Sequence, residues 1–207
     1  CSSDLFVLPW GARSEVAGQQ VAWRALRAHP ASGSRSLVMG LLGGTKPGLL
    51  MFVGNKQASG NAVERAGLAS GQVYRIGVAA HAAETRAHDA GLGLVDRQTE
   101  FTLIGGSGDP LADRVTPSTD WLNPSDGAWD PLHPKDFYFV TQDRMDGAKE
   151  GGVDADTPAS QRGRSRLWRL SFHDLERPER GGTLTLLENG AAATGAYQRR
   201  SAVQVVQ

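Results

Sequence analysis

The stretch STDWLNPSDGAWDPLHPKDFYFVTQDR, residues 118–144, combines the densest turn chemistry of the sequence with its clearest strand. Its first part contains NPSDG at 123–127, DP at 130–131 and HP at 133–134. Proline fixes φ and lacks an amide proton, and Asn, Asp and Gly favour turns, so we predict repeated turns and no helix here. The FYFVT segment at 137–141 is aromatic and β-branched on both alternating faces, which predicts a strand buried on both sides.

Five aspartates punctuate this region: Asp120, Asp126, Asp130, Asp136 and Asp143. Carboxylates that turns hold beside a rigid strand can form a site for a hard cation such as calcium, which accepts irregular geometry and several oxygen ligands. The alternative is that an aspartate in an Asp-Gly or Asp-Pro turn caps its own backbone and otherwise contacts water. The spacing alone leaves both interpretations open.

Short apolar segments separated by glycine and proline recur along the chain. We predict further strands at 5–10, 21–26, 37–42, 49–53, 72–78, 100–104, 166–172 and 183–187. Two hairpins are expected, one from 37–42 with 49–53 and one from 166–172 with 183–187. The connection 55–71 has room for a single helical turn at 62–66. The pattern predicts an all-β fold.

Several other polar residues have both a functional and a structural interpretation. Residues 79–90 are rich in helix formers and are expected to form a short surface helix or an irregular insertion. In a helix, His81 and His88 would share one face, with Glu84 and Asp89 nearby, as metal ligands or as exposed polar residues. Glu64 is the one carboxylate of its connection, and we expect it to pair with a neighbouring arginine. Arg166 and Arg169 belong to a basic run that could meet a phosphate group, but their place in an alternating strand favours structural support.

Composition limits the classes of partner. Twenty-two Lys and Arg residues are balanced by 22 Asp and Glu residues, which gives a formal net charge of zero. This balance removes the usual electrostatic basis for binding nucleic acid or an anionic membrane. No apolar run reaches the roughly 18 to 20 residues of a membrane span, and the start lacks the layout of a signal peptide.

The two ends of the sequence are interpreted separately from its middle. Cys1 is the only cysteine, so neither an internal disulfide nor a cysteine-based zinc cluster is expected. The CSS start is that of a mature lipid-anchored protein, and CSSDL is also what a common sequencing-adapter end encodes; we favour the second interpretation. Residues 1–5 are therefore expected to be a non-native end. Residues 191–207 are expected to be another, because the strand pattern stops after Asn189 and Gly190. We expect residues 1–207 to form a single domain that is a fragment of a larger protein.

Three strings in the sequence resemble the PhoX-type alkaline phosphatase family. DGAWDPLHPKDFYFVTQD at 126–143 contains an Asp-Gly turn, a Trp-Asp-Pro and the FYFVT strand. RSRLWRLSFHDLERPERGGTLTLLENG at 164–190 contains an RLWRL strand. MFVGNK at 51–56, with SGNAVERAGL at 59–68, is similar to another recurring stretch of the same family.

The resemblance implies a β-propeller, in which four-stranded blades surround a central channel. A compact blade takes roughly 40 to 45 residues, so a chain of this length holds only a few. We therefore expect an all-β partial β-propeller, with a few four-stranded blades and long loops, cut from a larger propeller. The resemblance also implies a periplasmic or extracellular location.

The function that the resemblance implies is metal-dependent hydrolysis of phosphate monoesters, with a small phosphorylated molecule as substrate. Calcium and iron are the implied ions, because metal ions neutralise phosphate oxygens and polarise an attacking oxygen. Asp126 and Asp130 are the metal ligands expected on this basis. The chain has Ser125 where relatives usually carry a carboxylate, and Cys1 cannot supply the internal cysteine ligand of true phosphatases.

Two alternative functions stay open at this point. A noncatalytic propeller module would keep the strand, turn and aromatic features and bind a ligand or partner on its face, with a metal at most structural. A lactonase-like hydrolase on a similar propeller would also use a calcium ion.

Overall fold

The structure is a computed structural model that describes residues 15–16, 19–20, 22–43, 47–79, 81–84, 97–105, 118–141 and 165–189. The elements within these ranges are β1 (Glu15–Val16), β2 (Gln19–Gln20), β3 (Ala22–Ala28), β4 (Arg35–Gly43), β5 (Gly48–Asn55), α1 (Ala62–Arg65), β6 (Gly71–Val78), β7 (Gln98–Gly105), β8 (Pro124–Trp129), β9 (Asp136–Thr141), β10 (Arg166–Phe172), the short 3-10 helix η2 (Pro178–Arg180) and β11 (Gly182–Asn189).

Nine of these strands form one antiparallel sheet in the order β3-β4-β5-β6-β7-β11-β10-β9-β8. The order contains two meanders of consecutive strands, one from β3 to β7 and one from β8 to β11. They join where β7 pairs with β11, with Gly182 opposite Phe101. The second meander has the four antiparallel strands expected of a propeller blade, whereas the first has five, and the hydrogen-bonded ladder continues from one to the other.

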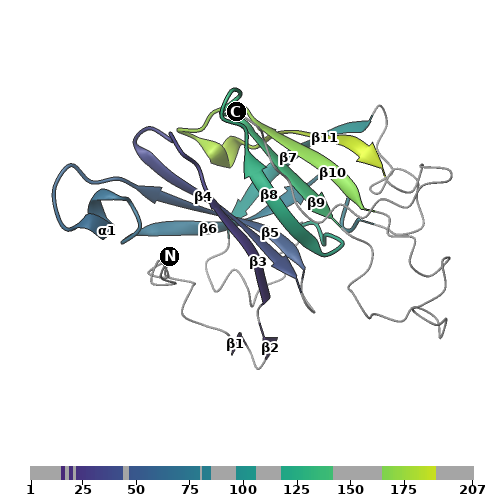
Figure 1. Cartoon of the computed structure of the whole chain (residues 1–207), viewed down its shortest axis with the longest axis horizontal. Helices are drawn as coiled ribbons and strands as arrows, with labels where there is room; N and C mark the ends of the chain where they lie inside the picture. Colours follow the sequence, from purple (N-terminus) through teal and green to yellow (C-terminus); the bar gives the residue numbers. More distant parts are fainter. Residues whose placement is uncertain are drawn as a thin grey trace.

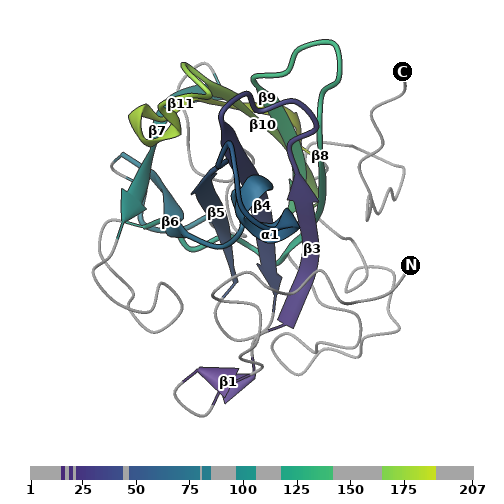
Figure 2. The same ribbon diagram turned by 90° about the vertical axis from the view of Figure 1, so that its left-hand side faces the viewer.

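The sheet curves until its two ends lie side by side. Figure 1 shows the second meander lying across the first, and Figure 2 shows the strands surrounding an interior with β3 beside β8. Antiparallel strands twist, and bulges increase the twist locally. Register shifts occur in β3 between Trp23 and Ala25, in β8 between Pro124 and Asp126, and in β11 between Leu186 and Glu188, opposite Leu167 and Trp168 of β10.

Aromatic side chains fill the interior of this curved sheet. Trp121 contacts Phe139 and Trp168 edge to face, with ring centroids 5.1 and 5.6 Å apart. Trp129 lies 5.0 Å from Phe137 in the same way. Such pairs contribute roughly 0.5 to 1.5 kcal/mol beyond the burial of their area. The interior therefore draws its largest side chains from the second meander and from the segment that precedes it.

The opposite face of β4 and β5 carries a smaller apolar cluster. It consists of Val38, Leu42, Leu50 and Phe52, with the partly buried Leu68 packed against it. Leu68 follows α1, whose N-terminus is fixed by a capping box in which Asn61 and Glu64 bond to each other's backbone amides. Both faces of β4 and β5 are thus covered, in agreement with their continuous apolar sequences.

Most of the predicted elements are confirmed. The FYFVT segment forms β9, in which Phe137, Phe139 and Val140 are buried and Tyr138 is half-buried. Both predicted hairpins form, β4 with β5 and β10 with β11, and the predicted helical turn is α1.

The predicted turn at 123–127 is wrong, because Pro124–Trp129 is strand β8. Pairing with β9 overrides the local turn chemistry. Pro124 is the first residue of an end strand, where no ladder amide is needed. Asn123, just before it, adopts a left-handed φ of 42°. Gly127 is required for a packing reason, since a Cβ there would lie 2.6 Å from the Phe137 ring.

Some of the sequence predictions lie outside the described residues. These are the ends at 1–5 and 191–207, the strand at 5–10, and the residues His88 and Asp143. Of the predicted helix or irregular insertion at 79–90, residues 81–84 are described, and they form isolated bridges rather than a helix. In the part of the chain that the structure describes, no helix has the length and apolar character that crossing a membrane requires.

We expect Gly181→Ala to lower the free energy of unfolding by about 3 kcal/mol, measured by urea denaturation. Gly181 has a φ of 71°, and a Cβ there would lie 1.9 Å from the Phe101 carbonyl oxygen at the start of the β7–β11 junction. The matched control is Gly105→Ala, whose Cβ would meet only the side chains of Gln72 and Tyr74. Equal effects of the two substitutions would contradict this account.

Candidate functional site

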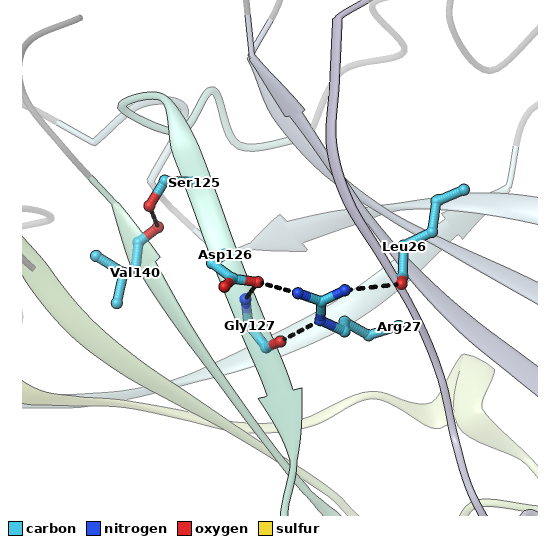
Figure 3. Close-up of polar contacts among 6 residues, drawn as sticks. All are labelled: Leu26, Arg27, Ser125, Asp126, Gly127 and Val140. Atoms are coloured by element: carbon cyan, nitrogen blue, oxygen red, sulfur yellow. Dashed lines mark hydrogen bonds and ion pairs between the residues drawn. The ribbon is translucent and has the colours of Figure 1, made fainter. Parts of the chain in front are cut away.

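Asp126 lies on β8 and forms an ion pair with Arg27 on β3. Arg27 Nη2 donates to Asp126 Oδ1 at 2.6 Å, Nε donates to the Gly127 carbonyl at 2.9 Å, and Nη1 donates to the Leu26 carbonyl at 3.3 Å (Figure 3). The Gly127 amide also donates to Asp126 Oδ1, at 2.8 Å. The guanidinium thus bridges the two end strands of the sheet.

Two further side chains reinforce this junction. Trp129 Nε1 donates to the Arg27 carbonyl at 3.0 Å, so that β3 and β8 each receive a side-chain hydrogen bond on a main-chain oxygen. His29, just after β3, contacts the Pro134 carbonyl through Nε2 at 2.8 Å. We call this junction, formed by Arg27, His29, Asp126, Gly127 and Trp129, the β3–β8 seam.

Asp130 follows β8 and organises the turn that leads into β9. Its Oδ1 accepts hydrogen bonds from the amides of Leu132 at 2.8 Å and His133 at 3.1 Å, and its Oδ2 lies 3.0 Å from His133 Nδ1. Burial works to raise the pKa of Asp130, but the hydrogen bonds from the His133 side chain and from these two amides hold it below its ordinary value. The carboxylate therefore acts as the cap of its own turn.

The described geometry does not bring Asp126 and Asp130 together as ligands of one ion. A strand rises about 3.3 Å per residue, so residues four apart lie roughly 13 Å from each other, whereas calcium needs its oxygens at about 2.3–2.6 Å. Each carboxylate also already accepts protein donors. Within the described ranges, no three His, Cys, Asp or Glu side chains form a group that could hold a metal ion. The metal-ligand assignment of Asp126 and Asp130 stays a prediction, and the arrangement does not fit a shared calcium or iron ion.

The other residues singled out in the sequence are used structurally. Glu64 completes the capping box of α1 in place of the predicted arginine pair. Asp136 lies 3.7 Å from Arg169 across β9 and β10. Asp120 takes part in an isolated bridge with Ala83, and its backbone bonds to the two neighbours of that residue.

A buried ion pair between Glu84 and Arg166 lies among the interior side chains. Arg166 Nη1 donates to Glu84 Oε1 at 2.9 Å, and both side chains are fully buried. The Thr141 hydroxyl donates to the same oxygen at 2.8 Å, and the Leu122 amide donates to Oε2 at 3.0 Å. Trp168 Nε1 in turn donates to the Thr141 hydroxyl at 3.0 Å.

Four separate parts of the chain meet at this buried pair. Glu84 follows β6, Leu122 precedes β8, Thr141 ends β9, and Arg166 begins β10. Burial raises the pKa of Glu84, while the Arg166 charge and the hydrogen bonds from Leu122, Thr141 and Arg166 act in the opposite direction. The pair therefore fixes where the segment 81–84, of which only Glu84 is buried, meets β9 and β10.

The pairing of Glu84 with Arg166 was not predicted from the sequence. Glu84 lies in an alanine-rich segment that favoured a surface helix, and its partners are 38 to 82 residues away in the chain. The one usable signal was the alternation of 166–172, which assigned Arg166 to a strand with a structural role. That structural role is confirmed by its full burial against Glu84.

Fold and site together define an all-β protein with one nearly closed antiparallel sheet, a side-chain seam between its ends and a charged pair in its interior. No protein-family model and no curated protein match the sequence.

A solved structure matches this sheet. It is Pseudomonas fluorescens PhoX in complex with vanadate, a transition state analogue, with a TM-score of 0.50 and 12% sequence identity. The match covers 81% of this chain and 31% of the PhoX chain, so the chain spans about a third of the length of the protein it matches. The expected all-β fold, matching part of the PhoX β-propeller, is thereby confirmed. At this identity the likeness shows the fold alone.

We expect the Arg27–Asp126 pair to contribute about 0.5 kcal/mol of coupling in a double-mutant cycle of Arg27→Met and Asp126→Asn. The value is small because the Arg27 side chain is 44% exposed. Arg27→Met alone should cost more, because it also leaves the Gly127 carbonyl without its donor. The control cycle is Arg177→Met with Asp174→Asn, an exposed local pair at 3.3 Å, for which coupling near zero is expected. A larger coupling in the control than in the seam would contradict this assignment.

We expect Arg166→Met to lower the free energy of unfolding by about 3 to 5 kcal/mol, because it strands the Glu84 carboxylate in the interior. The double variant Arg166→Met/Glu84→Leu removes both charges and should recover much of the loss. Urea denaturation of the two variants measures this difference. A double variant less stable than Arg166→Met would show that the pair is not coupled in this way.

Proposed function

We propose that this chain is part of a PhoX-like phosphatase that hydrolyses phosphate monoesters, with the curved sheet as part of its propeller scaffold. The observation that supports the proposal is the match of 81% of the chain to PhoX bound to vanadate. The strings at 126–143 and 164–190, which resemble the PhoX-type family, support it independently. On the same basis we propose that residues 1–207 are a single-domain piece of the larger protein, that the substrate is a small phosphorylated molecule, and that the location is periplasmic or extracellular.

The role that we propose for the described residues is scaffolding rather than metal ligation. Asp126 is held by Arg27, and Asp130 is held by its own turn and by His133. We infer that calcium or iron, where a phosphatase containing this chain binds them, is held by residues other than these two. The interior pair of Glu84 and Arg166 holds in place the strand ends from which such residues would project.

A second candidate function is a noncatalytic propeller module. The observation that favours it is the same engagement of both aspartates by protein donors, together with Ser125 in place of the carboxylate usual in PhoX-type relatives. Such a module would keep the sheet, the seam and the aromatic interior without hydrolytic activity. No contact among the described residues favours the lactonase-like alternative over these two.

The proposal is tested by measuring phosphate release from p-nitrophenyl phosphate. The protein assayed is the one encoded by the complete reading frame that contains this chain. We expect hydrolysis that chelation abolishes and added calcium restores, because metal ions stabilise charge on the transferring phosphoryl group. Bound metal without hydrolysis of this ester would favour the noncatalytic module.

The variant Asp126→Asn separates scaffolding from ligation in the same assay. We expect its metal content, measured by mass spectrometry, and its hydrolysis to match the unmodified protein. Asp174→Asn, which removes a half-buried aspartate paired with Arg177, is the matched control. Loss of both metal and activity in Asp126→Asn alone, with unchanged urea unfolding, would overturn the scaffolding role and make Asp126 a ligand.

A further inference from the structure

His29 directly follows β3 and is buried beneath the turn that joins β8 to β9. The residue is 7% exposed. Its ring meets the Trp129 ring edge to face, with centroids 4.6 Å apart. Its Nε2 lies 2.8 Å from the Pro134 carbonyl, and the Ala31 amide donates to its Nδ1 at 3.0 Å. His29 therefore connects two parts of the chain that are more than 100 residues apart.

These contacts select one protonation state of the ring. The Ala31 amide can only donate, so Nδ1 must accept and carries no hydrogen. The single ring hydrogen is then on Nε2, from which it donates to the Pro134 carbonyl. In the imidazolium form both nitrogens carry hydrogens, and Nδ1–H would face the Ala31 amide hydrogen. The observed geometry thus accommodates neutral His29 and conflicts with its cation.

Burial and one neighbouring cation also disfavour the charged form of His29. The charged and titratable groups on the elements around His29 are Arg24 and Arg27 on β3, Arg35 on β4, Lys56 after β5, Asp126 on β8, Asp130, His133 and Lys135 in the turn before β9, and Glu176, which bonds to Ser34. Burial lowers the pKa of His29 below its ordinary value of 6.5, the hydrogen bond to Pro134 acts against this, and the charge of Lys56 lowers the pKa further. The direction agrees with the hydrogen-bond geometry.

We propose that His29 is a pH-sensitive latch that holds one end of the β3–β8 seam closed while neutral and releases it when protonated. Protonation ends the acceptor role of Nδ1 and places a charge in a buried position. The ring then leaves its place between Ala31 and Pro134. Arg27 and Asp126 stay paired, so the opening is confined to the end of the seam at the β8–β9 turn. This inference does not depend on the proposed phosphatase function.

The pH window follows from the direction of the shift. A base whose pKa is lower in the folded state binds fewer protons folded than unfolded, so its contribution is present above 6.5 and is lost as pH falls below that value. The pKa of Asp130 is lowered from its ordinary value of 3.8, so the stability that this carboxylate contributes is lost only as pH falls below 3.8. That pH window is separate from the window of His29. Glu84, whose pKa is raised, acts in the opposite sense, because acid favours its buried neutral form.

The latch is tested by amide hydrogen exchange of the full chain at about pH 7.5 and about pH 5.0. The rates are corrected for the intrinsic pH dependence of exchange. We expect protection of residues 27–31 and 127–135 to fall roughly tenfold at the lower pH, while β4, β5 and β6 keep theirs. In His29→Gln, the side-chain amide can donate to Pro134 and accept from Ala31 without titrating, so the pH response should disappear. His173→Gln, at an exposed histidine beside Glu100, is the matched control and should keep the response.

Three outcomes would overturn the latch: a response that persists in His29→Gln, a loss of protection that is uniform across the sheet, or no response in the unmodified chain. Where His29→Gln does not fold, nuclear magnetic resonance of the unmodified chain decides. We expect the His29 ring to titrate below 6.5 together with the resonance of the Trp129 indole N–H. Titration of His29 without any change at Trp129 would equally overturn the proposal.

Discussion

The hydrogen bonds that Arg27 and Trp129 make across β3 and β8 replace the ladder that would otherwise join the ends of the sheet. An end strand presents unpaired main-chain groups, and here a side chain from each strand bonds to a carbonyl of the other. The indole of Trp129 also packs on Phe137 and Phe172, so the same residue belongs to the seam and to the interior. Because the interior side chains come from both meanders, they stay away from water only while the ends of the sheet meet.

Two of the ion pairs among the described residues have different physical roles. Arg27 and Asp126 are partly exposed, so water screens their charges and their value lies in the geometry of the guanidinium, which also reaches a main-chain oxygen. Glu84 and Arg166 are fully buried, where desolvation offsets much of their attraction. The buried pair is better understood as fixing one arrangement of four chain segments, since every misplaced arrangement would leave a charge in an apolar interior.

The parts of the fold that were predicted from sequence are those that local pattern decides. Residues 137–141 and 166–172 are strands because their side chains suit a covered sheet in any context. Strand β8 was missed because its Asn, Pro, Asp and Gly residues favour turns locally, and only pairing with β9 makes them extended. The β3–β8 seam could not be predicted for a different reason. Arg27 and Asp126 are 99 residues apart, and the sequence around either residue does not indicate the other as its partner. The match to PhoX agrees with the family resemblance at the level of fold. Nothing in the sequence around Glu84 indicated its pairing with Arg166, 82 residues away.

The division of the sheet into two meanders has a consequence for how the chain acquires its structure. Each meander pairs strands that follow one another, so its contacts close short loops and can form early. The pairing of β7 with β11 and the meeting of β3 with β8 join residues roughly 80 to 100 positions apart, so they carry the largest loop-closure entropy. We therefore expect assembly to end with the docking of the two halves. Until then, each half would expose the apolar side that the other covers.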